Sequence, residues 1–292
     1  GWPYGNENLP LEERAQVVIL NAQKIKGPVT FEESAYSLAL EVDPGVTTKN
    51  PRRTAELISL KLVPNPMEDM SQIIDLDSQL GQQTIKFDVP EGEYYFYAVI
   101  RDDSFAQVIN GAPGAAGSIL DHMNAEAVRK YLNNMSDTIQ AKLGPLSNNV
   151  RALFTDSMEL EGTNWCSDFR EEFQKRNGYD IMPYLPFIMF KVGRLGDVQD
   201  FNYGAQKGEA LADTLRRVRF DFEFTKAQLL RERYNDEYIK WCQELGVKSR
   251  AQSYGRGFFP LESSLGYDIP EGESWTTNWL RHVVGEEMSD ED

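Results

Sequence analysis

The spacing of apolar residues changes once in the first third of the chain. Through residues 7–26 they recur at helical spacing among good helix formers, which predicts a helix that stops at Gly27-Pro28. Beyond that point the period becomes two, and the tetrapeptide Pro90-Glu91-Gly92-Glu93 has the composition of a hairpin turn. We therefore expect half-buried antiparallel strands at 36–42, 57–63, 84–89 and 94–100.

From residue 104 onward, strand-like and helix-like patterns alternate. Helices are predicted at 125–144 after the capping residue Asn124, at 167–178 before Gly178, in the short segment YLPFIMF, and through 205–245 as one or two helices. Strands are predicted at 150–155, 247–254 and 266–274. Strands that alternate with long helices are typical of βα units around a parallel sheet, so the fold class is α/β.

Charge and composition narrow the classes of partner. Lys and Arg number 30 against 46 Asp and Glu, a net charge of −16, which argues against nucleic acid and anionic membranes and suits a neutral ligand such as a sugar. Only two His and two Cys are present, too few for a typical zinc site or a His-based triad. No apolar run reaches the length of a membrane span, and the opening GWPYGNENLP does not resemble a signal peptide.

Most of the candidate catalytic and binding residues follow the ends of the predicted strands. Acidic or polar residues follow three strands, and a further polar group precedes the helix at 125; they are Asp156, Glu159 and Glu161, then Gln252 and Tyr254, then Glu271 and Glu273, and upstream Asp121, His122 and Asn124. In βα folds the loops at these strand ends carry the active site. Two facing carboxylates are the minimum for glycoside hydrolysis, and Trp165 could raise the pKa of an acid or stack on a sugar.

Ordinary structural roles explain the same residues almost as well. A carboxylate after a strand is often a helix cap or a solvated loop residue, His122 beside Asp121 is as suited to capping, and Trp165 fits a core. The string PEGE occurs at 90–93 and again at 270–273, so it carries no catalytic information outside its context.

Six motifs, taken in order, carry a resemblance to a known family. They are GWPYG, DVPEGEYYFYAV, ILDHMNAEAVRKYL, LFTDSMELEGTNW with FREEFQKRNGYDIMPYLP, SRAQSYG, and YDIPEGE. Together they resemble the central part of glycoside hydrolase family 106, the α-L-rhamnosidases, over nearly the whole chain. The resemblance implies inverting hydrolysis of terminal α-L-rhamnose by two glutamates, assisted by a calcium ion.

The resemblance also assigns roles to individual residues. It implies Glu159 and Glu271 as the catalytic pair, with Glu161 and Glu273 as alternatives. We assign Glu159 as acid and Glu271 as base, and the reverse assignment stays open. Six positions are implied as contacts for sugar or calcium, with the metal ligands themselves unknown; they are Asp121, His122, Asn164, Trp165, Gln252 and Tyr254.

The implied fold is a partial (β/α)8 TIM-type barrel with an inserted small antiparallel β-domain. We expect residues 1–27 as a barrel segment, 28–103 as the insertion, 104–284 as the barrel segment with the catalytic loops, and 285–292 as an acidic tail. A complete barrel takes about 250 residues, so the remainder of the barrel is an expected partner.

The expected substrate is a rhamnose-containing glycoside, oligosaccharide or polysaccharide, and the family implies a periplasmic or secreted enzyme. Two other hypotheses stay open. One is a non-catalytic carbohydrate-binding or structural remnant of such an enzyme, and the other is a retaining glycosidase for another sugar.

Overall fold

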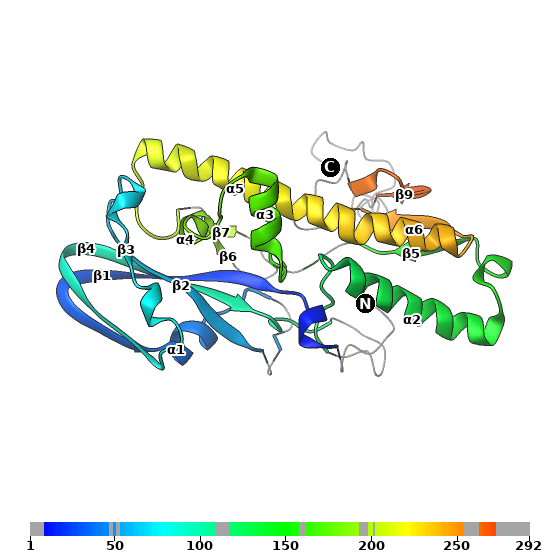
Figure 1. The fold of residues 1–292 in the computed structure, drawn as a ribbon, viewed down its shortest axis with the longest axis horizontal. Coiled ribbons are helices and arrows are strands. Elements are labelled where there is room, and N and C mark those ends of the chain that lie inside the picture. Colours follow the sequence, from blue (N-terminus) through cyan, green and yellow to red (C-terminus); the bar gives the residue numbers. More distant parts are fainter. Residues whose placement is uncertain are drawn as a thin grey trace, which may run out of the picture.

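The computed structural model describes residues 9–46, 49–50, 53–108, 117–157, 160, 162–192, 198–200, 202–253 and 263–272. Within these ranges the protein is a mixed α/β structure with an antiparallel sheet at one end and a parallel sheet at the other (Figure 1). A closed barrel is not among the described elements. None of the described helices combines the length and the apolar character needed to cross a bilayer.

The larger sheet has four antiparallel strands in the order β1-β4-β2-β3. Its strands are β1 (Val17–Ser34), β2 (Ala55–Pro64), β3 (Ile74–Asp75) and β4 (Thr84–Asp102). Both faces are covered. Tyr97 and Val99 of β4 join the main core beneath the helices, whereas Phe96 and Ala98 join a second core on the opposite face.

Strand β1 overturns the helix expected over 7–26. Residues from Val17 onward pair with β4 along its full length, from Val17 opposite Asp102 to Ser34 opposite Thr84. The run Val17-Val18-Ile19 is β-branched and fully buried, so long-range pairing outweighs the helical spacing of its apolar residues. The sheet therefore begins ahead of the expected boundary between residues 27 and 28.

The hairpin expected at 90–93 is also wrong, because β4 continues through it as one strand. At a register shift between Gly27 and Val29 of β1, two residues of β4, Pro90 and Glu91, stand opposite the single residue that separates Gly27 from Val29, so β4 has one extra residue. Gly27 is required there, since a Cβ would lie 1.8 Å from the carbonyl oxygen of Pro90.

Segment 36–42 is a helix rather than a strand. Helix α1 (Ala35–Leu40) begins after Ser34, whose hydroxyl accepts a hydrogen bond from the backbone N–H of Ser37. Tyr36 is 66% exposed while Leu38 is buried, so only part of the apparent apolar alternation faces a core. The N-terminal cap decides the structure here. The strands expected at 57–63, 84–89 and 94–100 are confirmed.

The smaller sheet confirms the predicted parallel arrangement. Strands β5 (Ala152–Thr155), β8 (Lys248–Gln252) and β9 (Ile269–Glu271) are parallel, with β8 in the middle. A separate antiparallel pair, β6 (Lys191–Val192) and β7 (Val198–Asp200), lies between the sheets in sequence.

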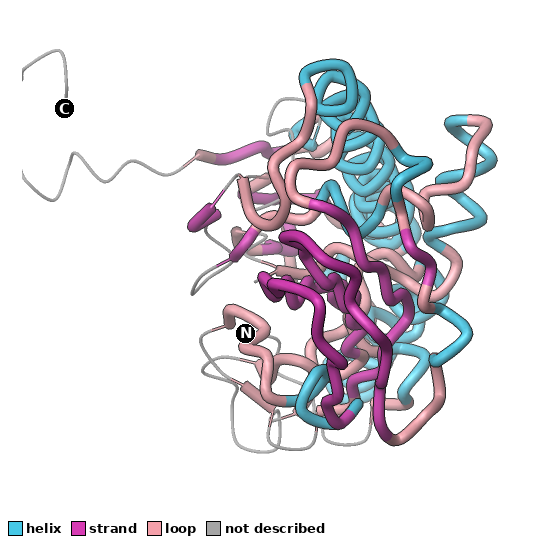
Figure 2. Tube along the Cα trace, turned by 90° about the vertical axis from the view of Figure 1, so that its left-hand side faces the viewer, coloured by secondary structure: helices cyan, strands magenta, loops and turns pink. Residues whose placement is uncertain are grey.

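The helices predicted from residue 125 onward are confirmed, and the helices gather mainly on one side of the strands (Figure 2). They are α2 (Ala125–Leu143), α3 (Phe169–Asn177), α4 (Leu185–Ile188), α5 (Glu209–Leu230) and α6 (Asp236–Glu244), with short 3-10 turns at Leu11–Glu13, Met70–Gln72, Asp77–Gln79 and Leu146–Asn148. A π-helical turn, Arg231–Asn235, joins α5 and α6 into one rod that passes over both halves of the molecule. Asn124 caps α2 through Ala127, and Gly178 ends α3 with a φ of 81°.

Candidate active site at the end of the parallel sheet

The carboxyl ends of the three parallel strands lie along one edge of the small sheet. Thr155 of β5 is opposite Ala251 of β8, and Gln252 of β8 is opposite Glu271 of β9. Gln252 and Glu271 are therefore neighbours in space although 19 residues apart in the chain. Glu159 and Glu161 follow β5, Tyr254 follows β8 and Glu273 follows β9, but these four lie outside the described residues.

The two faces of this sheet differ sharply in burial. Toward the helices, Thr155, Ser249 and Ala251 are almost fully buried. On the other face, Phe154 is 42% exposed and Arg250 is exposed as well. Parallel sheets are normally covered on both faces. Among the described residues, this exposed face with its aromatic and charged side chains is therefore the surface best suited to bind a ligand.

Arg250 links all three strands across the open face. Its guanidinium carbon lies 4.6 Å from the centroid of the Phe154 ring. Its Nη2 donates to Oε2 of Glu271 at 2.9 Å, and its Nε donates to the other carboxylate oxygen. Glu271 is 24% exposed in this pair. Sequence reasoning missed Arg250, although the alternation of Lys248, Arg250 and Gln252 with buried neighbours marks them as one face.

The covered face is held by buried hydrogen bonds. The hydroxyl of Thr155, the last residue of β5, lies 2.8 Å from the hydroxyl of Tyr234 in the π-helical turn. Asp268 accepts from both the backbone N–H and the hydroxyl of Ser249. Next to Tyr234, Asn235 donates to the carbonyl of Ser263 and accepts from the hydroxyl of Tyr267. The π-helical turn thus connects the end of β5 to the segment that leads into β9.

Asp121 and His122 are buried next to the π-helical turn. The Nδ1 atom of His122 lies 2.7 Å from the carbonyl oxygen of Leu120, and its ring packs 4.9 Å from that of Tyr234. Burial lowers the pKa of His122 to about 4, so the imidazole is neutral at physiological pH. Asp121 accepts from the N–H of Met123 at 2.8 Å, and burial raises its pKa to about 7. Both side chains are 4% exposed or less.

Asn164 and Trp165 make contacts with the framework of the fold. The side chain of Asn164 accepts from the N–H of Val18 at 2.7 Å and donates to the carbonyl of Val18 at 2.9 Å, as a neighbouring strand would. Trp165 is 5% exposed and stacks on Phe169 with ring centroids 4.6 Å apart. These two residues fasten the segment after β5 to β1 and to α3.

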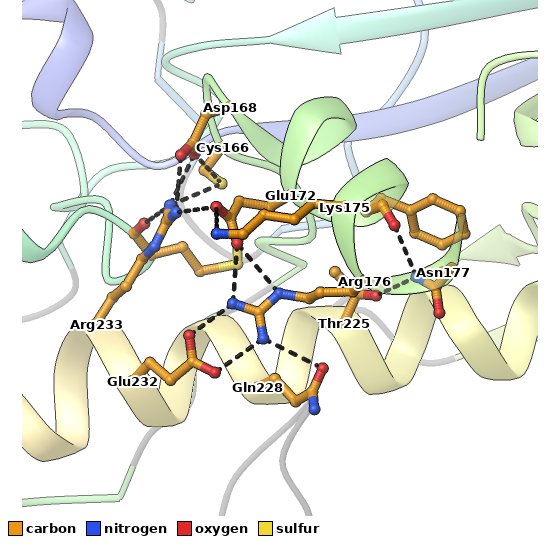
Figure 3. Close-up of polar contacts among 12 residues, drawn as sticks. Cys166, Asp168, Glu172, Lys175, Arg176, Asn177, Thr225, Gln228, Glu232 and Arg233 are labelled. Carbon is orange, nitrogen blue, oxygen red and sulfur yellow. Dashed lines mark hydrogen bonds and ion pairs between the residues drawn. The ribbon is translucent and has the colours of Figure 1, made fainter. Parts of the chain in front are cut away.

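A polar network that sequence reasoning missed holds α3 against the rod of α5 and α6 (Figure 3). Arg233 donates to both oxygens of Asp168 at 2.7 Å and to the carbonyl of Met123 at 2.9 Å. Arg176 bridges Glu172 and Glu232. Arg233 therefore joins the turn with Asp121 and His122 to the start of α3. The partners lie 65 and 110 residues from Arg233 in the sequence, so no local pattern signals them.

One kind of metal site, a group of at least three His, Cys, Asp or Glu side chains, does not occur among the described residues. Calcium also accepts carbonyl and amide oxygens as ligands, so the calcium ion implied by the resemblance stays a prediction. Cys166 and Cys242 are both buried free thiols.

A hollow of about 320 Å³ lies elsewhere, against the antiparallel sheet. Lys61 in its wall is bonded to the carboxylates of Asp75 and Asp77, at 2.9 and 2.5 Å. The fourth charged group in the wall, Asp180, is paired with Arg170. Because all four charged groups already have partners, this hollow offers less to a ligand than the open face of the parallel sheet.

Comparison with known proteins points to a family. The family model for glycoside hydrolase 106, described as alpha-L-rhamnosidase, matches residues 57–291. A protein of Formosa agariphila with a provisional beta-glucuronidase name is 26% identical over 219 residues. That alignment covers 74% of this chain and 18% of the Formosa protein.

A solved structure has a similar fold. The rhamnosidase from Novosphingobium sp. PP1Y superposes with a TM-score of 0.55 at 14% sequence identity. The match covers 86% of this chain and 38% of the rhamnosidase, so the chain spans well under half the length of either relative.

Proposed function

Because the chain belongs to glycoside hydrolase family 106, we propose that it hydrolyses terminal α-L-rhamnosyl bonds with inversion at the anomeric carbon. Glu159 is the acid and Glu271 the base in this proposal, with Glu161 and Glu273 as the alternatives. The substrate is a rhamnose-containing glycoside, oligosaccharide or polysaccharide, and the enzyme is periplasmic or secreted.

One observation carries the proposal: Glu271 ends a parallel strand on the open face of the sheet. It lies beside Gln252 at the edge where β5 also ends. Glu159 follows the last residue of β5, Thr155, by only four positions. Two carboxylates from separate strand ends at one edge are what hydrolysis requires.

The same sheet supports a partial (β/α)8 barrel as the architecture. In such a barrel each parallel strand has one face toward the surrounding helices and the other toward the barrel interior. Strands β5, β8 and β9 have one face buried against helices and one open face, and further βα units would close the ring. Phe154, Arg250 and Glu271 then face the interior, at the end where barrel enzymes place their chemistry.

The reaction follows from the two carboxyl groups. The protonated carboxyl of Glu159 gives its proton to the glycosidic oxygen as the bond to the anomeric carbon breaks. The carboxylate of Glu271 takes a proton from water, whose oxygen attacks that carbon from the opposite face. The products are the free alcohol and rhamnose of inverted configuration, and each glutamate has exchanged one proton.

Release of p-nitrophenol from p-nitrophenyl α-L-rhamnoside tests the proposal. Glu271→Gln should lower kcat by roughly 10²- to 10⁴-fold, since general acid–base catalysis contributes that much. The matched control is Glu91→Gln, which changes the equivalent residue of the other PEGE string, exposed in β4, and should leave kcat unchanged.

The leaving group separates the two roles. Because p-nitrophenolate departs without protonation, Glu159→Gln should lose less activity on this substrate than on a rhamnosyl disaccharide. Glu271→Gln should lose activity equally on both. Full activity in Glu271→Gln would remove this residue from the mechanism.

The Formosa relative's name makes β-glucuronide the necessary comparison substrate. Proton NMR of the first-formed sugar should show the β anomer from an α-L-rhamnoside. Turnover of p-nitrophenyl β-D-glucuronide alone, or a retained anomer, would contradict the proposed substrate or the proposed stereochemistry.

A further inference from the structure

Three side chains form a row across the open face of the parallel sheet, one from each strand. Phe154 of β5, Arg250 of β8 and Glu271 of β9 are in contact in that order. The central member is a long, flexible side chain that its two neighbours hold in one orientation.

Folding alone does not account for this row. Phe154 is 42% exposed, so its ring gains little from burial. Arg250 is 44% exposed, and exposed ion pairs contribute little to stability because water screens them and two side chains must be ordered. A stacked, bidentate arginine in this place adds orientation more than stability.

The contact orders Glu271 in particular. A guanidinium fork that bonds both carboxylate oxygens fixes the plane of the carboxylate. Each oxygen keeps a second lone pair, so a water molecule can still donate to it. Among the described residues, Arg250 is the cation within ion-pair distance of Glu271.

We propose that Arg250 is a positioning residue that holds the carboxylate of Glu271 in a fixed orientation for its role as the base, and that Phe154 in turn holds Arg250. This inference rests on the proposed function and adds two residues to it.

The test is chemical rescue of Arg250→Ala with guanidinium chloride. Removing the fork should lower kcat about 10- to 100-fold, in line with the effect of misplacing a catalytic group, while KM changes less than about threefold. Added guanidinium ion should raise the kcat of this variant at least about tenfold, because the Phe154 ring and the Glu271 carboxylate remain to bind it. Sodium chloride at the same ionic strength should not.

Two further variants complete the design. Lys248→Ala removes a cation from the same face of the same strand and should neither lose activity nor respond to guanidinium. Phe154→Leu keeps an apolar side chain but removes the stacking ring, so it should lower kcat about two- to fivefold, as loss of about 0.5–1 kcal/mol of cation–π contact predicts.

The outcomes separate this inference from the proposed function. If Glu271→Gln is inactive but Arg250→Ala keeps its kcat, Arg250 is a structural ion pair and the inference is wrong while the base assignment stands. A loss in Arg250→Ala that guanidinium does not repair, with a matching loss of thermal stability, also overturns it. If Glu271→Gln is fully active, the proposed function itself fails.

Discussion

The two sheets of this protein treat their faces in opposite ways. The antiparallel sheet has a core on each side, with Tyr97 and Val99 in one and Phe96 and Ala98 in the other. The parallel sheet buries Thr155, Ser249 and Ala251 on one face only, and leaves Phe154 and Arg250 exposed on the other. A strand with both faces in a core uses its side chains for packing, whereas a strand with one exposed face has side chains available to contact a ligand.

Length reinforces the difference. Strands β1 and β4 pair over 17 to 18 residues, while β9 contributes only three residues to its sheet. The long sheet is a scaffold, and the short one depends on its surroundings. Buried hydrogen bonds from Tyr234 and Asn235 of the π-helical turn supply that support.

The largest loss of stability is expected from a substitution at the register shift between β1 and β4. Gly27→Ala places a Cβ 1.8 Å from a backbone oxygen of Pro90, which cannot move without disturbing the strand. We expect the free energy of unfolding to fall by about 4 kcal/mol or more, as with other severe core clashes, measured by urea denaturation.

The control for this prediction is Gly81→Ala, in the turn before β4. A Cβ there meets nothing within 4 Å, and only the positive φ of 83° opposes it. The free energy of unfolding should fall by about 1–2 kcal/mol in this variant. Equal losses in the two variants would show that Pro90 is not held where the structure places it.

A smaller effect is expected from the buried histidine beside the π-helical turn. His122 has its pKa lowered to about 4 from 6.5 by burial. An unfolded chain takes up this proton near pH 6.5 and the folded protein only near pH 4, so the contribution of His122 to stability is lost as pH falls between them. The loss amounts to about 3 kcal/mol.

The pH dependence of His122→Gln relative to the parent isolates this contribution. Asp121, whose pKa is raised to about 7, has the opposite sign: its contribution is lost as pH rises from about 4 to 7. Asp121 is present in both proteins, so its effect cancels in the difference. The stability advantage of the parent over His122→Gln should shrink as pH falls from 6.5 to 4, and a constant advantage would mean that His122 is not sealed from water.

Local signals predicted the parts of the fold that local forces determine. Asn124 marked the start of α2 and Gly178 the end of α3, because caps act within a few residues. The parallel strands followed from their alternation with helices. Helical spacing failed for β1, whose structure is set by pairing with residues of β4 that lie 50 to 85 positions later in the chain, and the strand pattern at 36–42 failed against the cap at Ser34.

In the candidate site, too, local features could be predicted from the sequence and long-range contacts could not. Sequence placed Glu271 at a strand end, since a strand end is a local feature. The sequence did not reveal that Arg250, 21 residues earlier, is bonded to the carboxylate of Glu271, or that Phe154, 117 residues earlier, packs on Arg250. Strand order and register decide both contacts. Nor could the sequence show that Asn164 bonds to Val18 and that Trp165 stacks on Phe169, contacts that tie both residues to the framework.

The most direct test of the central claim is the separation of the Glu159 and Glu271 carboxyl groups in a crystal structure of the protein with rhamnose bound. Inverting hydrolysis at the open edge of the parallel sheet predicts about 6.5–9.5 Å between them, with the sugar lying between the two groups. Carboxyl groups on opposite sides of the molecule, or rhamnose bound away from this edge, would contradict the claim.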